Sequence, residues 1–215
     1  MYITRNREPF FELVRPFLKN NGTVLDIGAG NGSFARYFNR DDFFLIDGNE
    51  LTVNQFKKEF PNYSYAKLPE LNFCSSFFDV IHVSHVMEHL EIEVFYKTLI
   101  EIDKCLKFGG ILVVSMPTLT DFFYDDLSHV KPYNPSIFLK YLTNGKFNNL
   151  TRTKISDNYH LLKLQYRYES KKIMEFPEGT KNAIFFILNK FFGFLKILGI
   201  KKYVKTGYTI ILQKG

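Results

Sequence analysis

The sequence predicts an α/β protein built around a doubly wound, mostly parallel β-sheet. Short apolar runs alternate with longer stretches of helical periodicity, which is typical of strands joined by helical crossovers. The apolar run at 24–27 leads directly into three alternating glycines, Gly28, Gly30 and Gly32, and then into a helix-like stretch. A second apolar run, at 43–47, ends in an acid. These strand ends are expected to meet at one edge of the sheet, where ligands of such folds bind.

The apolar spacing places each element along the chain. A leading helix is expected over 7–19, because apolar residues recur there at helical spacing. Pro61 ends the helix of the second crossover, and Pro117 closes the fifth strand. In chain order, we expect strands at 23–27, 43–47, 63–66, 78–83, 110–116, 147–155, 160–168 and 207–213, and helices at 32–39, 50–60, 85–90, 92–107, 121–126 and 135–142.

The segment 23–34 has the residue types that a nucleotide-like ligand requires. Glycine adopts positive φ and lets the backbone pass close to a ligand, and the N–H groups of a helix start favour negative or hydrogen-bonding groups. Asp47 follows Asp26 by the length of one strand–helix–strand step. Its carboxylate can accept both hydroxyls of a ribose; alternatively, Asp47 is a turn or N-cap residue.

Length and composition exclude several classes of protein. A chain of 215 residues with 46% apolar residues buries one sizeable core and is not disordered. Cys74 and Cys105 stand far apart without a C-x-x-C motif, so neither a disulfide framework nor a zinc site is expected. The first residues lack the apolar core of a secretion signal, and we therefore expect a cytoplasmic location.

The charge is distributed unevenly. Residues 1–126 carry a net charge of −6, and residues 127–215 carry +12. The basic half suggests an anionic partner: a phosphorylated or otherwise anionic substrate, an anionic lipid surface or a nucleic acid. A solvated basic face that only aids solubility explains the charge equally well.

Four segments resemble, in order, the motifs of the class I S-adenosylmethionine (SAM)-dependent methyltransferases, in particular the small-molecule enzymes of types 11 and 23. They are 23–34, 43–47, 78–90, which ends in Glu88-His89-Leu90, and 106–117. The resemblance covers residues 20–145 and implies a single domain over 1–215. It also implies a Rossmann-like sheet of seven strands with an antiparallel edge strand, and a C-terminal helical cap insertion at about 159–204.

The same resemblance implies S-adenosylmethionine as the cofactor. In the family, the acid corresponding to Asp26 contacts the amino group of the methionine moiety, and the glycine backbone packs against methionine and ribose. The acid that usually meets adenine is replaced by Lys67, so backbone groups around 68–71 are expected to take its place. The predicted cofactor residues are Asp26, Gly28, Ala29, Gly30, Gly32, Asp47, Gly48, Leu71 and His85.

Three residues are predicted to act on the methyl acceptor: His129, His89 and Glu88. The segment 125–133 resembles a His-Val-Arg-Pro-Phe segment that lies over the active site in related enzymes, which makes His129 the predicted general base. Glu88 and His89 either serve the acceptor or cap a helix. Related quinone-pathway O-methyltransferases carry an acid where His85 stands, and some bind a divalent metal there; with histidine at this position, no metal is assigned.

The predicted function is methylation of a small molecule, on oxygen, in cell-surface glycan, lipid-linked or quinone-type biosynthesis. A non-catalytic adaptor that keeps the fold, and a nucleic-acid methyltransferase, are the alternatives; the Asn/Asp-Pro-Pro-Tyr/Phe motif of base-methylating relatives is missing, so nucleic acid is disfavoured. Residues 181–202 are phenylalanine-rich and flanked by lysines. They fit an interfacial membrane helix, a homodimer interface or a substrate cap, and Lys190 and Lys196 argue against a membrane span.

Overall fold

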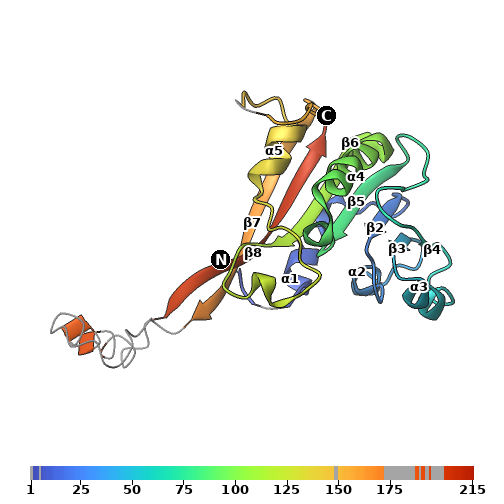
Figure 1. The fold of residues 1–215 in the computed structure, drawn as a ribbon. Coiled ribbons are helices and arrows are strands. Elements are labelled where there is room, and N and C mark those ends of the chain that lie inside the picture. Colours follow the sequence, from blue (N-terminus) through green and yellow to red (C-terminus); the bar gives the residue numbers. More distant parts are fainter. Residues whose placement is uncertain are drawn as a thin grey trace.

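A computed structural model describes residues 2–4, 6–147, 150–171 and 201–215, together with 187–188, 190–191 and 194. Its eight strands form one sheet (Figure 1) in the order β1-β7-β8-β6-β5-β2-β3-β4. In chain order the strands are β1 (Tyr2–Ile3), β2 (Val24–Ile27), β3 (Phe44–Asp47), β4 (Tyr63–Tyr65), β5 (Phe78–Ser84), β6 (Leu106–Pro117), β7 (Tyr159–Lys171) and β8 (Lys202–Lys214).

The predicted fold class is confirmed. Strands β6, β5, β2, β3 and β4 run parallel to one another, and β8 is antiparallel to both β6 and β7. The sheet has eight strands in place of the seven expected, because the short N-terminal β1 adds to β7. The antiparallel β8 lies inside the sheet, with β7 and β1 outside it.

Most helices fall where the apolar spacing predicts them, with shorter bounds. The α-helices are α1 (Glu8–Phe11), α2 (Ser33–Tyr37), α3 (Glu50–Phe56), α4 (Ile92–Cys105) and α5 (Ser136–Leu142), and the 3-10 turns are η1 (Arg15–Phe17), η2 (Met87–His89) and η3 (Phe123–Asp125).

Three expected elements differ from the prediction. The leading helix over 7–19 is split, because Pro16 has no N–H to continue it and its ring would clash with the preceding turn. The helix over 85–90 is only the turn η2, because His85 has a φ of 57° that no α-helix accommodates. The strand expected at 147–155 is absent from the described residues of that range.

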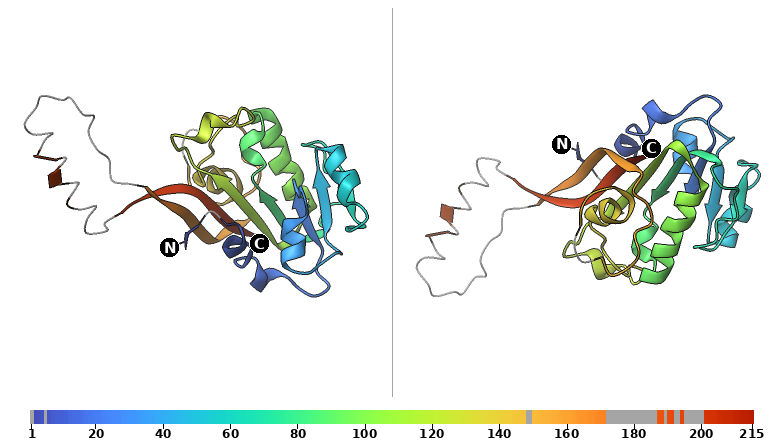
Figure 2. Two further views of the ribbon diagram at one scale, coloured as in Figure 1. Left: turned by 90° about the horizontal axis from the view of Figure 1, so that it is seen from below. Right: turned by 90° about the horizontal axis from the view of Figure 1, so that it is seen from above.

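Side chains of β2 alternate between two apolar layers. Leu25 and Ile27 face the layer covered by α4 and α5, while Val24 and Asp26 face the opposite layer, covered by α1, α2 and α3. Figure 2 shows helices on both faces of the sheet. The parallel strands are therefore buried on both faces, which leaves their carboxyl ends as the place where a ligand can bind.

The hairpin of β7 and β8 extends away from the rest of the sheet, as Figures 1 and 2 show. Its last paired residues are Lys171 and Lys202. The helical cap expected within 159–204 and the membrane or dimer segment at 181–202 lie largely outside the described residues, whereas 159–171 belongs to β7. Among the described residues, the helices are too short or too polar to pass through a bilayer.

Candidate active site

The glycine loop after β2 requires glycine for two different physical reasons. Gly28 has a φ of 70°, and a Cβ at this position would lie 2.1 Å from Cγ2 of Val86. Gly30 has a φ of 56°, but a Cβ there would meet no atom within 4 Å. Gly28 therefore allows close packing of the loop on the segment after β5, whereas Gly30 borders open space that a ligand can occupy.

The loop is held by hydrogen bonds from within the chain. The amides of Gly28 and Ala29 donate to the Ile46 carbonyl, at 2.8 and 3.1 Å. The amide of Gly30 donates to Asp47 Oδ2 at 2.9 Å, and the Tyr63 hydroxyl donates to the Gly30 carbonyl at 2.7 Å. These three amides, which precede the start of α2, are engaged within the chain. The loop can therefore serve a ligand through its shape and by letting the ligand come close to the backbone.

Asp47 joins the glycine loop to the next helix. In addition to Gly30, its carboxylate accepts the amide of Asn49 through Oδ1 at 2.8 Å. Asn49 in turn caps α3, with its side-chain oxygen accepting the amides of Leu51 and Thr52. The two interpretations of Asp47, ligand residue and turn residue, are thus compatible: its carboxylate organises the turn and also lines the cleft described next.

A cleft of about 510 Å³ opens at the carboxyl ends of β2, β3 and β5. This strand-end cleft is within the size range of small-ligand sites. Ile46, Ala66, Val86 and Leu90 supply apolar walls. Of the predicted site residues, it is lined by Gly28, Asp47, Gly48, His85 and His89.

Asp26 lies beneath the glycine loop and is only 2% exposed. Its Oδ1 is 2.7 Å from Nδ1 of His82, which is equally buried on the neighbouring β5. The His82 ring stacks on Phe34 of α2 at 3.9 Å between centroids. Asp26 therefore links two strands and the first crossover helix. The sequence did not single out His82, whose only signal is its place opposite Asp26 in the parallel register.

Leu71 and Lys67 occupy different surroundings. The Leu71 side chain is buried in the core, 2% exposed, outside the lining of the strand-end cleft. Lys67 and Leu68 line that cleft in the region predicted for adenine. The residues just after β4 thus reach the cleft, and the chain then turns inward at Leu71.

The half-buried His85 and the fully buried Glu88 form a pair after β5. Nδ1 of His85 lies 3.1 Å from Oε1 of Glu88, whose side chain is fully buried and whose Oε2 makes no hydrogen bond with a described residue. Burial lowers the pKa of His85 below its ordinary value of 6.5, and the Glu88 carboxylate opposes this shift. His85 is therefore a neutral ring at pH 7, with its Nδ1–H directed to Glu88 and Nε2 free to accept a proton.

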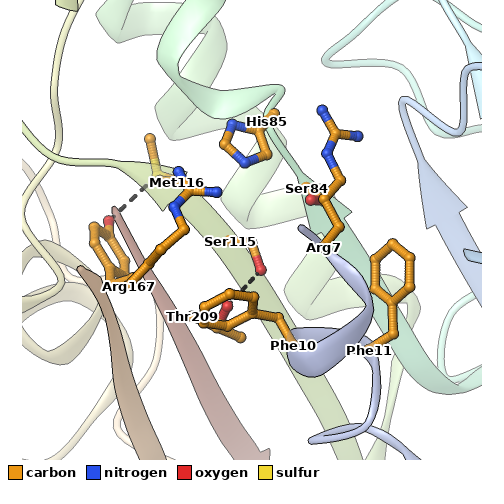
Figure 3. Close-up of a pocket in the computed structure, with 10 residues that line it drawn as sticks. Arg7, Phe10, Phe11, Ser84, His85, Ser115, Met116, Arg167 and Thr209 are labelled. Atoms are coloured by element: carbon orange, nitrogen blue, oxygen red, sulfur yellow. Dashed lines mark hydrogen bonds between the residues drawn. The ribbon is translucent and has the colours of Figure 1, made fainter. Parts of the chain in front are cut away.

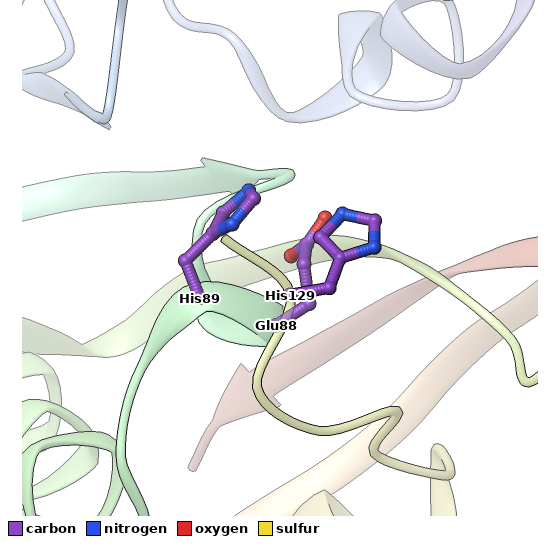
Figure 4. Close-up of side chains that lie close together, drawn as sticks. All are labelled: Glu88, His89 and His129. Carbon is purple, nitrogen blue, oxygen red and sulfur yellow. The ribbon is translucent and has the colours of Figure 1, made fainter. Parts of the chain in front are cut away.

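His89 and His129 lie together, 4.9 Å between ring centroids, beside Glu88 (Figure 4). Nδ1 of His89 bonds to the Ser128 carbonyl at 3.1 Å, and Nδ1 of His129 bonds to the Phe123 carbonyl at 2.6 Å. A carbonyl only accepts, so Nδ1 of each ring carries a proton and Nε2 of the neutral ring is a proton acceptor. The Phe123 carbonyl thus orients His129, whereas Asp126 is 4.0 Å from its Nε2.

The backbone of Glu88 positions this histidine pair. Its carbonyl accepts the amides of Val130 and Lys131, at 2.8 and 3.2 Å, and so fixes the loop that carries His129 over η2. One ligand atom each from Glu88, His89 and His129 lie within 4.8 Å of one another. Such a carboxylate–imidazole set can hold a divalent cation.

These features find their counterpart in known proteins. A family model described as a methyltransferase domain matches residues 2–168. The chain therefore belongs to the methyltransferase domain family, and S-adenosylmethionine is its cofactor. The open space at Gly30 and the size of the strand-end cleft fit a ligand with a nucleoside portion. No curated protein matches the chain.

Several solved structures share the fold. A SAM-dependent methyltransferase from Archaeoglobus fulgidus is 22% identical, with a TM-score of 0.63 over 97% of this chain and 95% of that one. The YcgJ protein of Bacillus subtilis is 15% identical, with a TM-score of 0.61 over 98% and 100%. The [4+2]-cyclase SpnF is 14% identical, with a TM-score of 0.58 over 96% and 81%. At such identities the likeness shows the fold alone.

Proposed function

We propose that this protein is a SAM-dependent methyltransferase that methylates a hydroxyl group of a small molecule, in cell-surface glycan, lipid-linked or quinone-type biosynthesis. The observation that carries the proposal is the position of His85. Its ring lines the strand-end cleft and also a second pocket, beside Arg7 and Arg167. A proton acceptor therefore lies where a cofactor in the cleft and an acceptor in the second pocket would meet.

In this proposal the chain forms one domain over 1–215, whose core at 20–145 holds the cofactor. Asp47 faces the ribose, and Lys67 and Leu68 border the adenine. When bound, S-adenosylmethionine supplies an electrophilic methyl group. The chain has to exclude water, hold the acceptor oxygen in line and take up its proton. The proposed cofactor residues are Asp26, Gly28, Ala29, Gly30, Gly32, Asp47, Gly48, Leu71 and His85, with Asp26 and Leu71 acting beneath the cleft.

His129, His89 and Glu88 are proposed to serve the acceptor. With Nδ1 held by a carbonyl, Nε2 of His129 would take up the proton that the acceptor hydroxyl gives up. His85, whose Nδ1 is bonded to Glu88, can do the same. The anionic or lipid-linked nature of the acceptor, and a peripheral membrane contact or homodimer through 181–202, belong to the same proposal.

Replacing Asp47 by alanine tests the cofactor site. The variant loses the acceptor for the amides of Gly30 and Asn49. We expect binding of S-adenosylhomocysteine, measured by calorimetry, to weaken about 10- to 100-fold, the effect of losing a charged hydrogen-bond partner. Asp41→Ala, at an exposed acid just before β3, is the matched control. Equal affinity in Asp47→Ala would remove Asp47 from the site, and no binding by the wild type at millimolar ligand would favour the adaptor function.

The titration of His85 tests the proposed proton acceptor. Because burial disfavours the charged ring, its NMR titration midpoint is expected below 6.5, so the neutral form persists as the pH falls to that midpoint. Glu88→Gln should lower the midpoint further, because the carboxylate stabilises the protonated ring. His85→Gln identifies the resonance. A midpoint above 6.5 in the wild type, or an upward shift in Glu88→Gln, would contradict this assignment.

A further inference from the structure

Two arginines face the second pocket, which lies next to the strand-end cleft. Figure 3 shows Arg7, from the segment before α1, and Arg167, from β7, on either side of His85. The Ser115 and Thr209 hydroxyls bond to each other at 2.7 Å on the neighbouring strands β6 and β8. We call this space the arginine pocket.

Neither guanidinium in the arginine pocket forms an ion pair with a described residue. This distinguishes them from the other arginines that the structure describes, each of which has a carboxylate within 4.0 Å. Those pairs are Arg15–Glu12, Arg36–Glu59, Arg40–Asp42 and Arg152–Glu93. Arg167 is half-buried, and partly removing its charge from water costs free energy. No carboxylate in direct contact offsets that cost among the described residues.

The surrounding charges do not neutralise the pair. Burial and the positive charge of Arg7 both lower the pKa of Arg167, while the negative charges of Glu88 and Glu169 raise it. Glu88 is bonded to His85, and Glu169 has a contact of its own. Two cations that line one pocket without a directly paired acid form a site for an anion. Guanidinium groups match carboxylate and phosphate oxygens in geometry.

The fold makes room for this arrangement. Gly207 of β8 lies beneath Arg167, and a Cβ at that position would come within 2.6 Å of its guanidinium nitrogen. The open space within the pocket measures about 10 Å³, enough for one oxygen atom of an anionic group, while the rest of that group would lie toward Arg7. Arg7 is exposed, so the remainder of a larger ligand would extend past it to solvent.

We propose that the arginine pocket binds the anionic group, a carboxylate or phosphate, of the methyl acceptor. This inference rests on the proposed function, because it places the acceptor beside His85 and across from the strand-end cleft. The methionine carboxylate of the cofactor has the same chemistry. The lining favours the acceptor, since it comes from β5, β6, β7, β8 and the N-terminal segment and includes no residue of the glycine loop 28–32.

The test uses inorganic phosphate as the probe and the full chain saturated with S-adenosylhomocysteine. Phosphate is titrated by calorimetry at constant ionic strength set with chloride. We expect phosphate to bind the wild type and to bind Arg167→Gln at least about tenfold more weakly, with Arg167→Lys in between. Arg40→Gln removes the same charge outside the pocket and should stay within about twofold of the wild type. If Arg167→Gln fails to fold, Arg7→Gln at its exposed position provides the same comparison.

The two sources of the anion give different results. For an acceptor site, S-adenosylhomocysteine binds Arg167→Gln within about twofold of its wild-type affinity. The proposal is overturned if phosphate does not bind, if Arg167→Gln binds it as the wild type does, or if phosphate competes with S-adenosylhomocysteine. Competition would assign the pocket to the cofactor carboxylate, and 5′-methylthioadenosine, which lacks that group, should then bind wild type and variant alike. If S-adenosylhomocysteine does not bind at all, the proposed function fails, and the phosphate titration without it still tests the pocket.

Discussion

Asp26→Ala is expected to lower the free energy of unfolding by about 2–5 kcal/mol, because it leaves buried His82 without its partner. For a domain of this size, that corresponds to a fall in Tm of about 10 °C. Urea denaturation followed by circular dichroism measures the effect. The change is large because Asp26 connects β2 with β5 and, through His82, with Phe34 of α2.

Two further variants separate a structural role of Asp26 from contact with the cofactor. Asp26→Asn keeps an oxygen that can accept from His82, so it should retain most of the stability. In a double-mutant cycle, Asp26→Ala and His82→Ala should be clearly non-additive. Wild-type stability in Asp26→Ala would show that the pair does not support the fold. Loss of S-adenosylhomocysteine binding by a stable Asp26→Asn would show that the carboxylate also acts on the ligand, as the family resemblance implies.

Gly28→Ala is expected to destabilise the protein by about 2–5 kcal/mol, the sum of a strained positive φ and a methyl group forced against Val86. Thermal denaturation measures this loss. The double variant Gly28→Ala/Val86→Ala removes the collision and should recover part of the stability, while the strain of the backbone remains.

Gly30→Ala is the matched comparison. Its methyl group meets no atom of the chain, so only the strain of about 1–3 kcal/mol is expected. Under the proposed function this open space holds the ligand, so binding of S-adenosylhomocysteine should fall more than stability does. Equal stability of Gly28→Ala and wild type, or undiminished ligand binding by Gly30→Ala, would contradict the two roles assigned to these glycines.

Much of the fold could be predicted from the sequence because its strands and helices have clear periodicity. The sequence runs that form β2, β3 and β5 are short, apolar and followed by glycine or polar residues. They are apolar throughout because a parallel strand is buried on both faces of the sheet. Local pattern could not show that Tyr2 and Ile3 add to β7, because that pairing joins Tyr2 to Arg167 across most of the chain. Nor could local pattern predict that His85 adopts a left-handed conformation, which prevents the expected helix over 85–90 from starting there.

The sequence predicts that the candidate site lies at the strand ends, but it predicts few of the hydrogen bonds between the residues there. Spacing along the chain predicts that Asp47 and Gly28 lie near each other, because strand ends of a parallel sheet converge, and both line the strand-end cleft. Which side chain bonds to which depends on register. The sequence alone predicts a ligand contact for Asp26, and only the pairing of β2 with β5 brings it opposite His82. Arg7 and Arg167 carry no local signal: they come from distant segments, and only the completed sheet brings them to one pocket.

Because β8 lies inside the sheet, the sheet cannot be completed until the end of β8 has been synthesised. As the chain leaves the ribosome, β6 emerges long before the residues that cover its free side; Ile111, for example, pairs with Gln213. Until then β6 exposes an unpaired apolar edge, and β7 has no neighbour through which to join the sheet. We therefore expect this half of the sheet to form late in synthesis, and the unpaired edge of β6 to be open to edge-to-edge pairing with other chains during that interval.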